Sequence, residues 1–302
     1  MTPLKILSLR SAFYTPVLLT AARFLPEAGV PADLIFRTDH EPSRMLREGT
    51  LDFSQLAPSA AMSDLSQGIK EPPVHFASVN ERDGFLLISR QPEPDFKWPD
   101  LEGRTVVPAS FAVQPEACLR FAMHRQGVDA GKVTLVQGLK GMAAATEAFA
   151  NGTGDYLQMQ DPTARALVHE GKGYLAAQFG PAIGPIAFSS VATSRRLITE
   201  QPDTVRSFLL AYRAARAWIA DNDPADIRDA IAQWFENAPP QVLLEAVAGY
   251  KALGTWTRQT AIARDAFETT LDMMIHSSEL TGVTERYTYE QCCDDTLARQ
   301  VD

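Results

Sequence analysis

The sequence predicts an α/β protein that folds into two lobes. Short apolar runs alternate with segments of helical periodicity along most of the chain, as in domains where helices cover a sheet. The proline-rich connection Gln91–Pro99 interrupts this alternation, and the same pattern then begins again. A further apolar run, Phe188–Ala192, precedes a helix-rich tail. We therefore expect two sheets, between which the chain crosses near Gly84–Ser89 and again near Phe188–Ala192.

The first lobe is predicted to consist of strands that alternate with short helices. Apolar runs predict strands at Lys5–Leu9, Leu34–Arg37, Leu51–Phe53 and Val74–Val79, and helices are expected from Pro16, Pro42 and Pro58. The last two helices end at Gly49 and Gly68, because glycine directly after a periodic segment is a common helix end.

The second lobe repeats this order, and a long helix follows it. Gly84–Ser89 is predicted as a strand at the first crossing, before the proline-rich connection. In the second lobe, strands are predicted at Thr105–Val107, Val133–Leu135 and Tyr156–Met159, with helices at Pro115–Arg125, around Met142–Ala150 and from Pro162. A helix from Pro202 carries an apolar face made of Val205, Phe208, Leu209, Tyr212, Ala215 and Ile219. These elements divide the chain into a first lobe over residues 1–88, a second lobe over 89–187 and a return to the first over 188–302.

Composition and charge exclude two classes of partner. The 302 residues are 45% hydrophobic and carry a net charge of −9. An acidic surface repels phosphate backbones, so we expect no nucleic-acid partner. No apolar run reaches the roughly 18 residues that a membrane span needs, so we expect none. A monomer is expected.

The cysteines and histidines give no sign of a disulfide framework, a metal site or a cofactor. Cys118, Cys292 and Cys293 are an odd number, and free thiols are the simplest interpretation. The five histidines are scattered, without metal-ligand spacing. We therefore predict no metal and no cofactor.

The order of short motifs resembles a known family. These motifs are Glu48–Phe53 followed by Ala57-Pro58-Ser59-Ala60, then Asp100–Val106, then Asn151–Tyr156 followed by Asp161-Pro162, and finally Pro202–Phe208. Together they are similar to the sulfonate, nitrate and thiamin-pyrimidine group of type II periplasmic solute-binding proteins, the SsuA/THI5-like proteins. Each motif alone is weak, but their order extends over nearly the whole chain.

The resemblance implies a fold and a function. The fold would be a type II periplasmic-binding-protein fold, with two lobes joined by two hinge strands and a ligand cleft between them. The function would be capture of a small organic ligand, such as a sulfonate, a pyrimidine or an aromatic acid, for an ABC importer with its permease. The start of the chain, MTPLKILSLRSAFYTP, has no signal-peptide pattern. We expect a periplasmic or lipid-anchored protein if a signal was trimmed, and otherwise a cytoplasmic one.

Ligands of open α/β sheets bind beyond the carboxyl ends of the strands, and this rule selects the loops that would line the cleft. They offer aromatic rings, hydroxyls, amides and charges that suit an organic ligand with several hydrogen-bonding groups. The predicted ligand-binding residues are Arg10, Ser11, Phe13, Tyr14, His40, Pro58, Ser59, Asn80, Arg82, Ser110, Phe111, Gln114, Gln158, Gln160 and Asp161.

An enzyme on the same fold stays open as an alternative. The first helix also resembles the aromatic desulfinases at Leu18-Leu19-Thr20-Ala21, but Ala12 stands where those enzymes carry a nucleophilic cysteine. The thymine-pathway pyrimidine synthases have a lysine and a histidine where Leu56 and Ala60 stand here. A cytoplasmic dehydratase and a ligand sensor also remain open. For an enzyme, the acid–base candidates are Glu81, Asp83 and Asp161. No catalytic residue is assigned, and the motifs favour a receptor.

Overall fold

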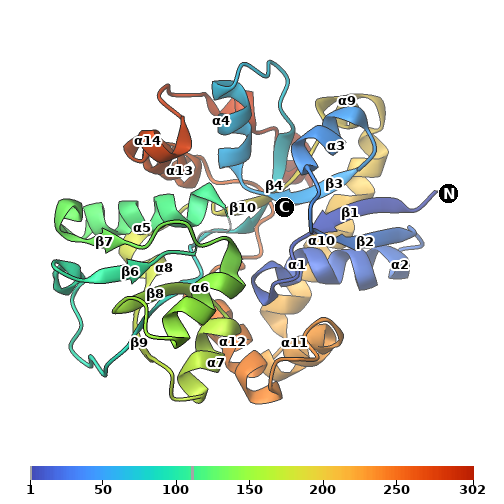
Figure 1. Cartoon of the computed structure of the whole chain (residues 1–302). Helices are drawn as coiled ribbons and strands as arrows, with labels where there is room; N and C mark the ends of the chain where they lie inside the picture. Colours follow the sequence, from blue (N-terminus) through green and yellow to red (C-terminus); the bar gives the residue numbers. More distant parts are fainter. Residues whose placement is uncertain (1, 110–111) are drawn as a thin grey trace.

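The computed structural model describes residues 2–109 and 112–302, which form two five-stranded sheets covered by helices (Figure 1). Two of the predicted ligand-binding residues, Ser110 and Phe111, lie outside the described residues. The predicted fold class is confirmed, since each sheet is the core of one lobe and the chain passes twice between them.

The first sheet has the strand order β2-β1-β3-β10-β4. Its strands are β1 (Leu4–Ser8), β2 (Ala32–Phe36), β3 (Phe53–Leu56), β4 (Val74–Asn80) and β10 (Ser189–Thr193). The first three run parallel, and β10 lies antiparallel between β3 and β4. The carboxyl ends of the parallel strands therefore meet at one edge, where their loops can form a site.

The second sheet has the strand order β7-β6-β8-β5-β9. Its strands are β5 (Phe85–Ser89), β6 (Thr105–Val107), β7 (Thr134–Leu135), β8 (Tyr156–Gln160) and β9 (Tyr174–Gln178). Strand β5 pairs antiparallel with both β8 and β9. The sequence pattern did not predict β9, an edge strand that is exposed at Tyr174 and Leu175 and in which the short apolar run ends in two alanines, residues with low strand propensity.

The two crossings lie between β4 and β5 and between β9 and β10. The whole of β5 belongs to the second sheet, so the chain leaves the first lobe between Asn80 and Phe85, slightly earlier than the boundary at residue 88. Gly84 lies in this crossing, where a Cβ atom would collide with the ring of Phe13. Glycine is required there because the aromatic ring packs directly beneath the crossing.

Helices cover both sheets. Those of the two lobes are α1 (Thr15–Leu19), continued by a π-helical turn (Thr20–Phe24) and α2 (Leu25–Glu27), then α3 (Pro42–Glu48), α4 (Pro58–Ser66), α5 (Val113–Arg125), α6 (Gly141–Ala150), α7 (Thr163–His169) and α8 (Phe179–Ile183). The tail adds α9 (Arg195–Glu200), α10 (Pro202–Asp221), α11 (Pro224–Ile231), α12 (Pro240–Leu253), α13 (Arg264–His276), α14 (Ser278–Thr281), α15 (Tyr289–Cys292) and α16 (Thr296–Val301).

The apolar face predicted for the long helix α10 is buried in full. Its Phe208 ring stacks on Phe53 of β3 with ring centroids 4.4 Å apart. The face thus joins α10 to the core of the first lobe.

The tail contacts both lobes, although it was predicted to return to the first lobe alone. Helix α12 packs against the turn before α1 in the first lobe and against α7 in the second, and α13 packs against both α4 and α5. Figure 1 shows α13 beside α5, and α12 between α7 and α11. Among the described helices, none combines the length and the apolar character that crossing a membrane requires.

Candidate functional site

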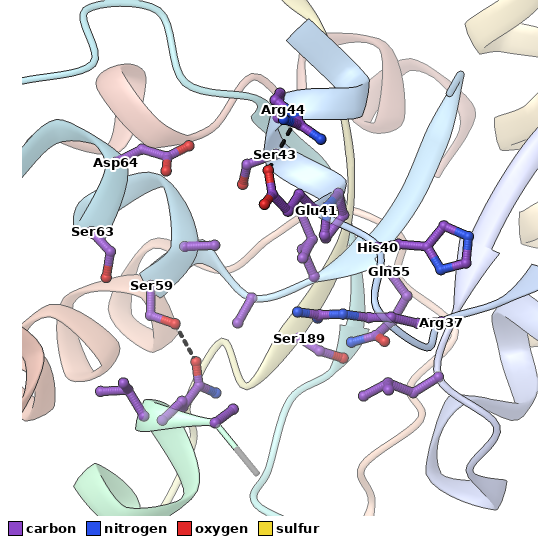
Figure 2. Close-up of a pocket in the computed structure, with 18 of the residues that line it drawn as sticks. Arg37, His40, Glu41, Ser43, Arg44, Gln55, Ser59, Ser63, Asp64 and Ser189 are labelled. Atoms are coloured by element: carbon purple, nitrogen blue, oxygen red, sulfur yellow. Dashed lines mark hydrogen bonds and ion pairs between the residues drawn. The ribbon is translucent and has the colours of Figure 1, made fainter. Parts of the chain in front are cut away.

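A pocket of about 490 Å³ lies between the lobes (Figure 2). Its walls come from the β2–α3 and β3–α4 connections of the first lobe and from the start of α5 in the second. Phe188 and Ser189, at the second crossing, and Met274 of α13 complete the lining. The volume falls in the usual range of small-molecule sites, roughly 300–1,000 Å³.

Hydrogen bonds tie the two lobes together beside this pocket. The Ser59 hydroxyl at the start of α4 donates to the side-chain oxygen of Gln114 at the start of α5 (Figure 2). Gln114 then donates from Nε2 to the carbonyl oxygen of Phe188, at 2.6 Å. Ser59 and Gln114 were both predicted to bind ligand. They come from opposite lobes, and both line the pocket.

Amide groups surround the hydroxyl of Tyr14, which lines the pocket. Burial raises the pKa of Tyr14, while Gln160 and Gln55 act in the opposite direction as neighbouring hydrogen-bonding side chains. The Nε2 of Gln160 and the Oε1 of Gln55 are nevertheless buried without a partner of good hydrogen-bond geometry among the described residues. Ser11 donates weakly to Gln160, at 3.4 Å. Unsatisfied buried polar atoms are uncommon in folded proteins, and a ligand could satisfy them.

Two helices begin at the pocket without a side-chain cap. Helix α4 has Ala57 as its N-cap and α5 has Ala112, and neither N-cap makes a side-chain hydrogen bond. Both alanines line the pocket. The first N–H groups of a helix have no partner inside the helix, and the helix dipole places partial positive charge there. The pocket therefore receives the positive ends of one helix from each lobe.

The charged side chains of the pocket leave one arginine without a carboxylate partner. The carboxylate of Glu41 lies 3.1 Å from the Nε of Arg44, and the carboxylate of Asp64 lies 3.2 Å from the Nη1 of Arg47. Arg37, directly after β2, makes no ion pair or side-chain hydrogen bond with any described residue, and it points into the pocket (Figure 2). Its side chain is exposed, but partial desolvation by the surrounding protein lowers its pKa.

The predicted ligand-binding residues fall into two groups. Tyr14, His40, Ser59 and Gln114 line the pocket. The Nδ1 of His40 accepts from the backbone N–H of Thr38, at 3.2 Å. The described residues of the second group lie outside this lining, and they are Arg10, Ser11, Phe13, Pro58, Asn80, Arg82, Gln158, Gln160 and Asp161.

Several residues of the second group hold the crossings or the neighbouring loops. Asn80 donates to the carbonyl of Phe13 at 2.8 Å and accepts from Ser189 at 2.6 Å, so it connects the two crossings to the first loop. Gln158 accepts from the backbone N–H of Ala109 and donates to the carbonyl of Pro115 in the first turn of α5.

The remaining residues of the second group pack or form ion pairs. Phe13 is completely buried, and its ring packs on Phe188 and Tyr250. Arg10 stacks over the ring of Phe36, 4.4 Å from its centroid. Pro58 is the buried first residue of α4, and the backbone carbonyl of Arg82 accepts from Thr255.

The acid–base candidates are engaged elsewhere. Glu81 pairs with the buried guanidinium of Arg216 at 3.0 Å, and Asp161 pairs with Arg165 at 2.8 Å. Burial raises the pKa of Asp83 to about 7, although it accepts a hydrogen bond from the backbone of Phe85. None of the three carboxylates lines the pocket. Among the described residues, no group of three or more metal-ligating side chains is found.

The sequence pattern missed Arg37, Gln55 and Ser189 as pocket residues. Arg37 was assigned to the end of a strand, but β2 ends at Phe36, and Arg37 lies in the following loop, where it lines the pocket. The third strand was placed at Leu51–Phe53, whereas β3 extends over Phe53–Leu56 and brings Gln55 to its carboxyl end. The strand-end rule selects Arg37 and Gln55 once these strand ends are placed correctly, whereas Ser189 begins the antiparallel strand β10 and the rule does not select it.

Comparisons with known proteins agree with this architecture. The family profile described as NMT1/THI5 like matches residues 14–226. YtlA of Bacillus subtilis (strain 168), named provisionally as a binding protein, is 25% identical over 295 residues, which cover 96% of this chain and 87% of that protein.

Solved structures give the same fold. The alkanesulfonate-binding protein SsuA of Xanthomonas axonopodis pv. citri, bound to MOPS, is 17% identical with a TM-score of 0.71, covering 95% of each chain. The periplasmic nitrate-binding protein NrtA of Synechocystis PCC 6803 is 12% identical with a TM-score of 0.70, covering 100% of this chain and 88% of that one. At these identities the likeness shows the fold alone.

Proposed function

Because this chain belongs to the NMT1/THI5-like family, we propose that it is a solute-binding protein that captures one small organic ligand between its lobes for an ABC importer. The observation that carries the proposal is the pocket that the two lobes share, with Ser59 of one lobe bonded to Gln114 of the other. A ligand in this pocket contacts both lobes, so it binds the closed arrangement more tightly than an open one. That difference in affinity is what favours closure.

The relatives support the proposed destination of the ligand. YtlA is named as a binding protein, and the SsuA and NrtA structures are named for sulfonate and nitrate binding. Delivery to a permease requires that the protein works outside the cytoplasmic membrane, in the periplasm or on a lipid anchor. We propose that compartment on the same grounds.

A native mass spectrum tests the proposal first. We expect the purified protein to retain a small molecule that denaturation releases unchanged. Ala60→Trp, which fills the pocket from α4, should abolish retention. Ala214→Trp, on the exposed side of α10, should leave it intact. Recovery of a chemically converted molecule, or equal retention in both variants, would contradict a receptor that uses this pocket.

Scattering supplies the second test. Ligand should reduce the radius of gyration of the free protein by closing the lobes. Tight binding in calorimetry without any compaction would contradict the proposed closure.

A further inference from the structure

We propose that the ligand is an organic monoanion whose carboxylate or sulfonate group is held by Arg37 and the uncapped starts of α4 and α5, while its neutral body lies on the apolar wall of the pocket. This inference rests on the proposed function and narrows it to one chemical class. It separates organic acids from the neutral pyrimidines and cationic amines that a pocket of this size could also take.

The first step is the charge of the pocket. Each carboxylate in the lining has its own arginine, Arg44 for Glu41 and Arg47 for Asp64. Arg37 is then the surplus positive charge among the described lining residues. One unpaired guanidinium balances one negative charge, and it would repel a cationic ligand. Guanidinium groups bind carboxylate and sulfonate oxygens with two parallel hydrogen bonds, which fixes orientation as well as charge.

The second step is the pair of uncapped helices. Alanine is a poor N-cap, and replacing a serine, threonine, asparagine or aspartate cap by alanine usually destabilises a helix. Yet Ala57 and Ala112 both occupy this position at the pocket, one in each lobe. Free N–H groups at a helix start form an anion site when an anion is present. At α4, Pro58 has no N–H and the N–H of Ala60 donates to the carbonyl of Ala57 at 2.8 Å, so the N–H of Ser59 is the group that α4 offers to an anion. An anion that contacts both helix starts would contribute directly to closure.

An independent sign of a ligand is the amide of Gln55. This side chain is only 5% exposed, it lines the pocket, and its Oε1 has no partner among the described residues. Such a group is costly to leave unsatisfied. A hydroxyl or amide N–H on the ligand, close to its anionic group, would donate to it.

The third step is the size and the polarity of the remaining wall. The cavity of about 490 Å³ has room for roughly 16 waters at about 30 Å³ each, far more than a small inorganic anion displaces. Apolar side chains form much of the lining, namely Leu9, Leu56, Ile69, Val113, Phe188 and Met274. A carbon skeleton of the ligand would cover this surface.

The test is a thermal-shift and calorimetry panel of matched probes. The panel compares five anions, each with its corresponding amide and amine: benzoate, 4-hydroxybenzoate, benzenesulfonate, hexanoate and hexanesulfonate. We expect only the anions to bind. Comparing benzoate with benzenesulfonate, and hexanoate with hexanesulfonate, shows which headgroup the pocket prefers. For the tightest anion, Arg37→Gln should weaken Kd about 10- to 100-fold, as expected for lost hydrogen bonds to a charged group. Arg37→Lys should retain part of the affinity.

The control is Arg213→Gln, which removes an equally exposed arginine from α10, away from the pocket, and should leave Kd unchanged. The inference is overturned if no anion binds, if an amide binds as tightly as its acid, or if Arg37→Gln binds the tightest anion as wild type does. Amides or amines that bind and are excluded by Ala60→Trp would preserve the proposed receptor while overturning its anion selectivity. Binding that Ala60→Trp leaves unchanged for every probe would overturn both.

Discussion

Arg216 shows how one buried residue fixes the start of the first crossing. Its side chain is fully buried and donates to the carbonyls of Ser78 and Thr257, at 2.7 and 2.8 Å, and to the carboxylate of Glu81, at 3.0 Å. We predict that Arg216→Met lowers the free energy of unfolding by about 3–5 kcal/mol, because buried acceptors lose their donor. Urea unfolding measures this. Arg213→Met, on the exposed side of the same helix, should stay within about 0.5 kcal/mol of wild type. Similar losses in both variants would contradict the role of Arg216.

Asp83 makes the first crossing sensitive to pH. Burial raises the pKa of its carboxyl to about 7, above the value of about 3.9 expected in the unfolded chain. The folded state therefore keeps the proton that the unfolded state loses. This contribution to stability is complete below about pH 4 and disappears as the pH rises through 7.

Asp83→Asn should remove this dependence, because the amide keeps the oxygen that accepts from Phe85 and cannot titrate. Measured by urea unfolding from pH 5 to pH 8, the variant should gain stability relative to wild type, by at most about 1.4 kcal/mol per pH unit. A stability difference that is constant over this range would show that Asp83 is already ionised in the folded protein.

At the scale of single elements, a capping side chain at the start of α4 would raise the stability of the protein and weaken the binding of an anion. Ala57 has the extended backbone angles of an N-cap, φ −120° and ψ 147°, but no side chain that can cap. Ala57→Asp should raise the free energy of unfolding by about 1 kcal/mol, since aspartate accepts from the first N–H groups and favours the helix dipole. The same carboxylate would occupy the proposed anion site, so the Kd for the tightest anion should weaken at least as much as in Arg37→Gln.

Ala57→Asn separates capping from charge in the same position. Asparagine caps as well as aspartate but adds no negative charge, so it should stabilise the protein and weaken anion binding less. Equal losses of affinity in the two variants would indicate that the new side chain blocks the pocket sterically. Unchanged affinity in Ala57→Asp would place the anion away from α4.

The elements also differ in how far the sequence could predict them. Every apolar residue predicted for the buried face of α10 is buried, because a long amphipathic pattern is a strong signal, but the pattern did not predict that the face also buries Arg216. Strand β9 was missed because its short apolar run contains two alanines, which have low strand propensity, and because it pairs along one edge with β5. Small errors at strand ends had a larger effect on the site. They excluded Arg37 and Gln55 from the predicted residues, whereas Ser59 and Gln114 follow strands that were placed closely enough for the strand-end rule to select them, and both line the pocket. Packing across the lobes, which occupies Asn80 and Gln158, cannot be predicted from local patterns.

For the whole molecule, the tail provides contacts between the two lobes in addition to the crossings. A hinge of two crossings alone would leave the lobes free to separate. Here α12 contacts the second lobe through Tyr250, which donates to the backbone of Asp161 at 3.1 Å, and through Glu245, which lies 3.0 Å from His169. The rings of Phe13 and Tyr250 also pack together, so α12 is anchored on the first lobe. The tail therefore acts as a contact between the lobes that needs no ligand.

We predict that weakening this contact opens the free protein. Tyr250→Phe combined with Glu245→Gln keeps the packing. The first change removes a buried hydrogen bond, worth about 0.5–1.5 kcal/mol, and the second removes the negative charge of an exposed pair, worth at most about 1 kcal/mol. The free double variant should have a larger radius of gyration by small-angle scattering, and saturating ligand should restore the wild-type value. Its affinity should fall in proportion to the closed fraction. Lys172→Gln, which breaks an exposed pair with Glu170 within the second lobe, is the control and should change neither property. If the double variant scatters and binds as wild type does, the closed arrangement does not depend on these contacts of α12, and the crossings, α13 and the bond between Ser59 and Gln114 hold it without them.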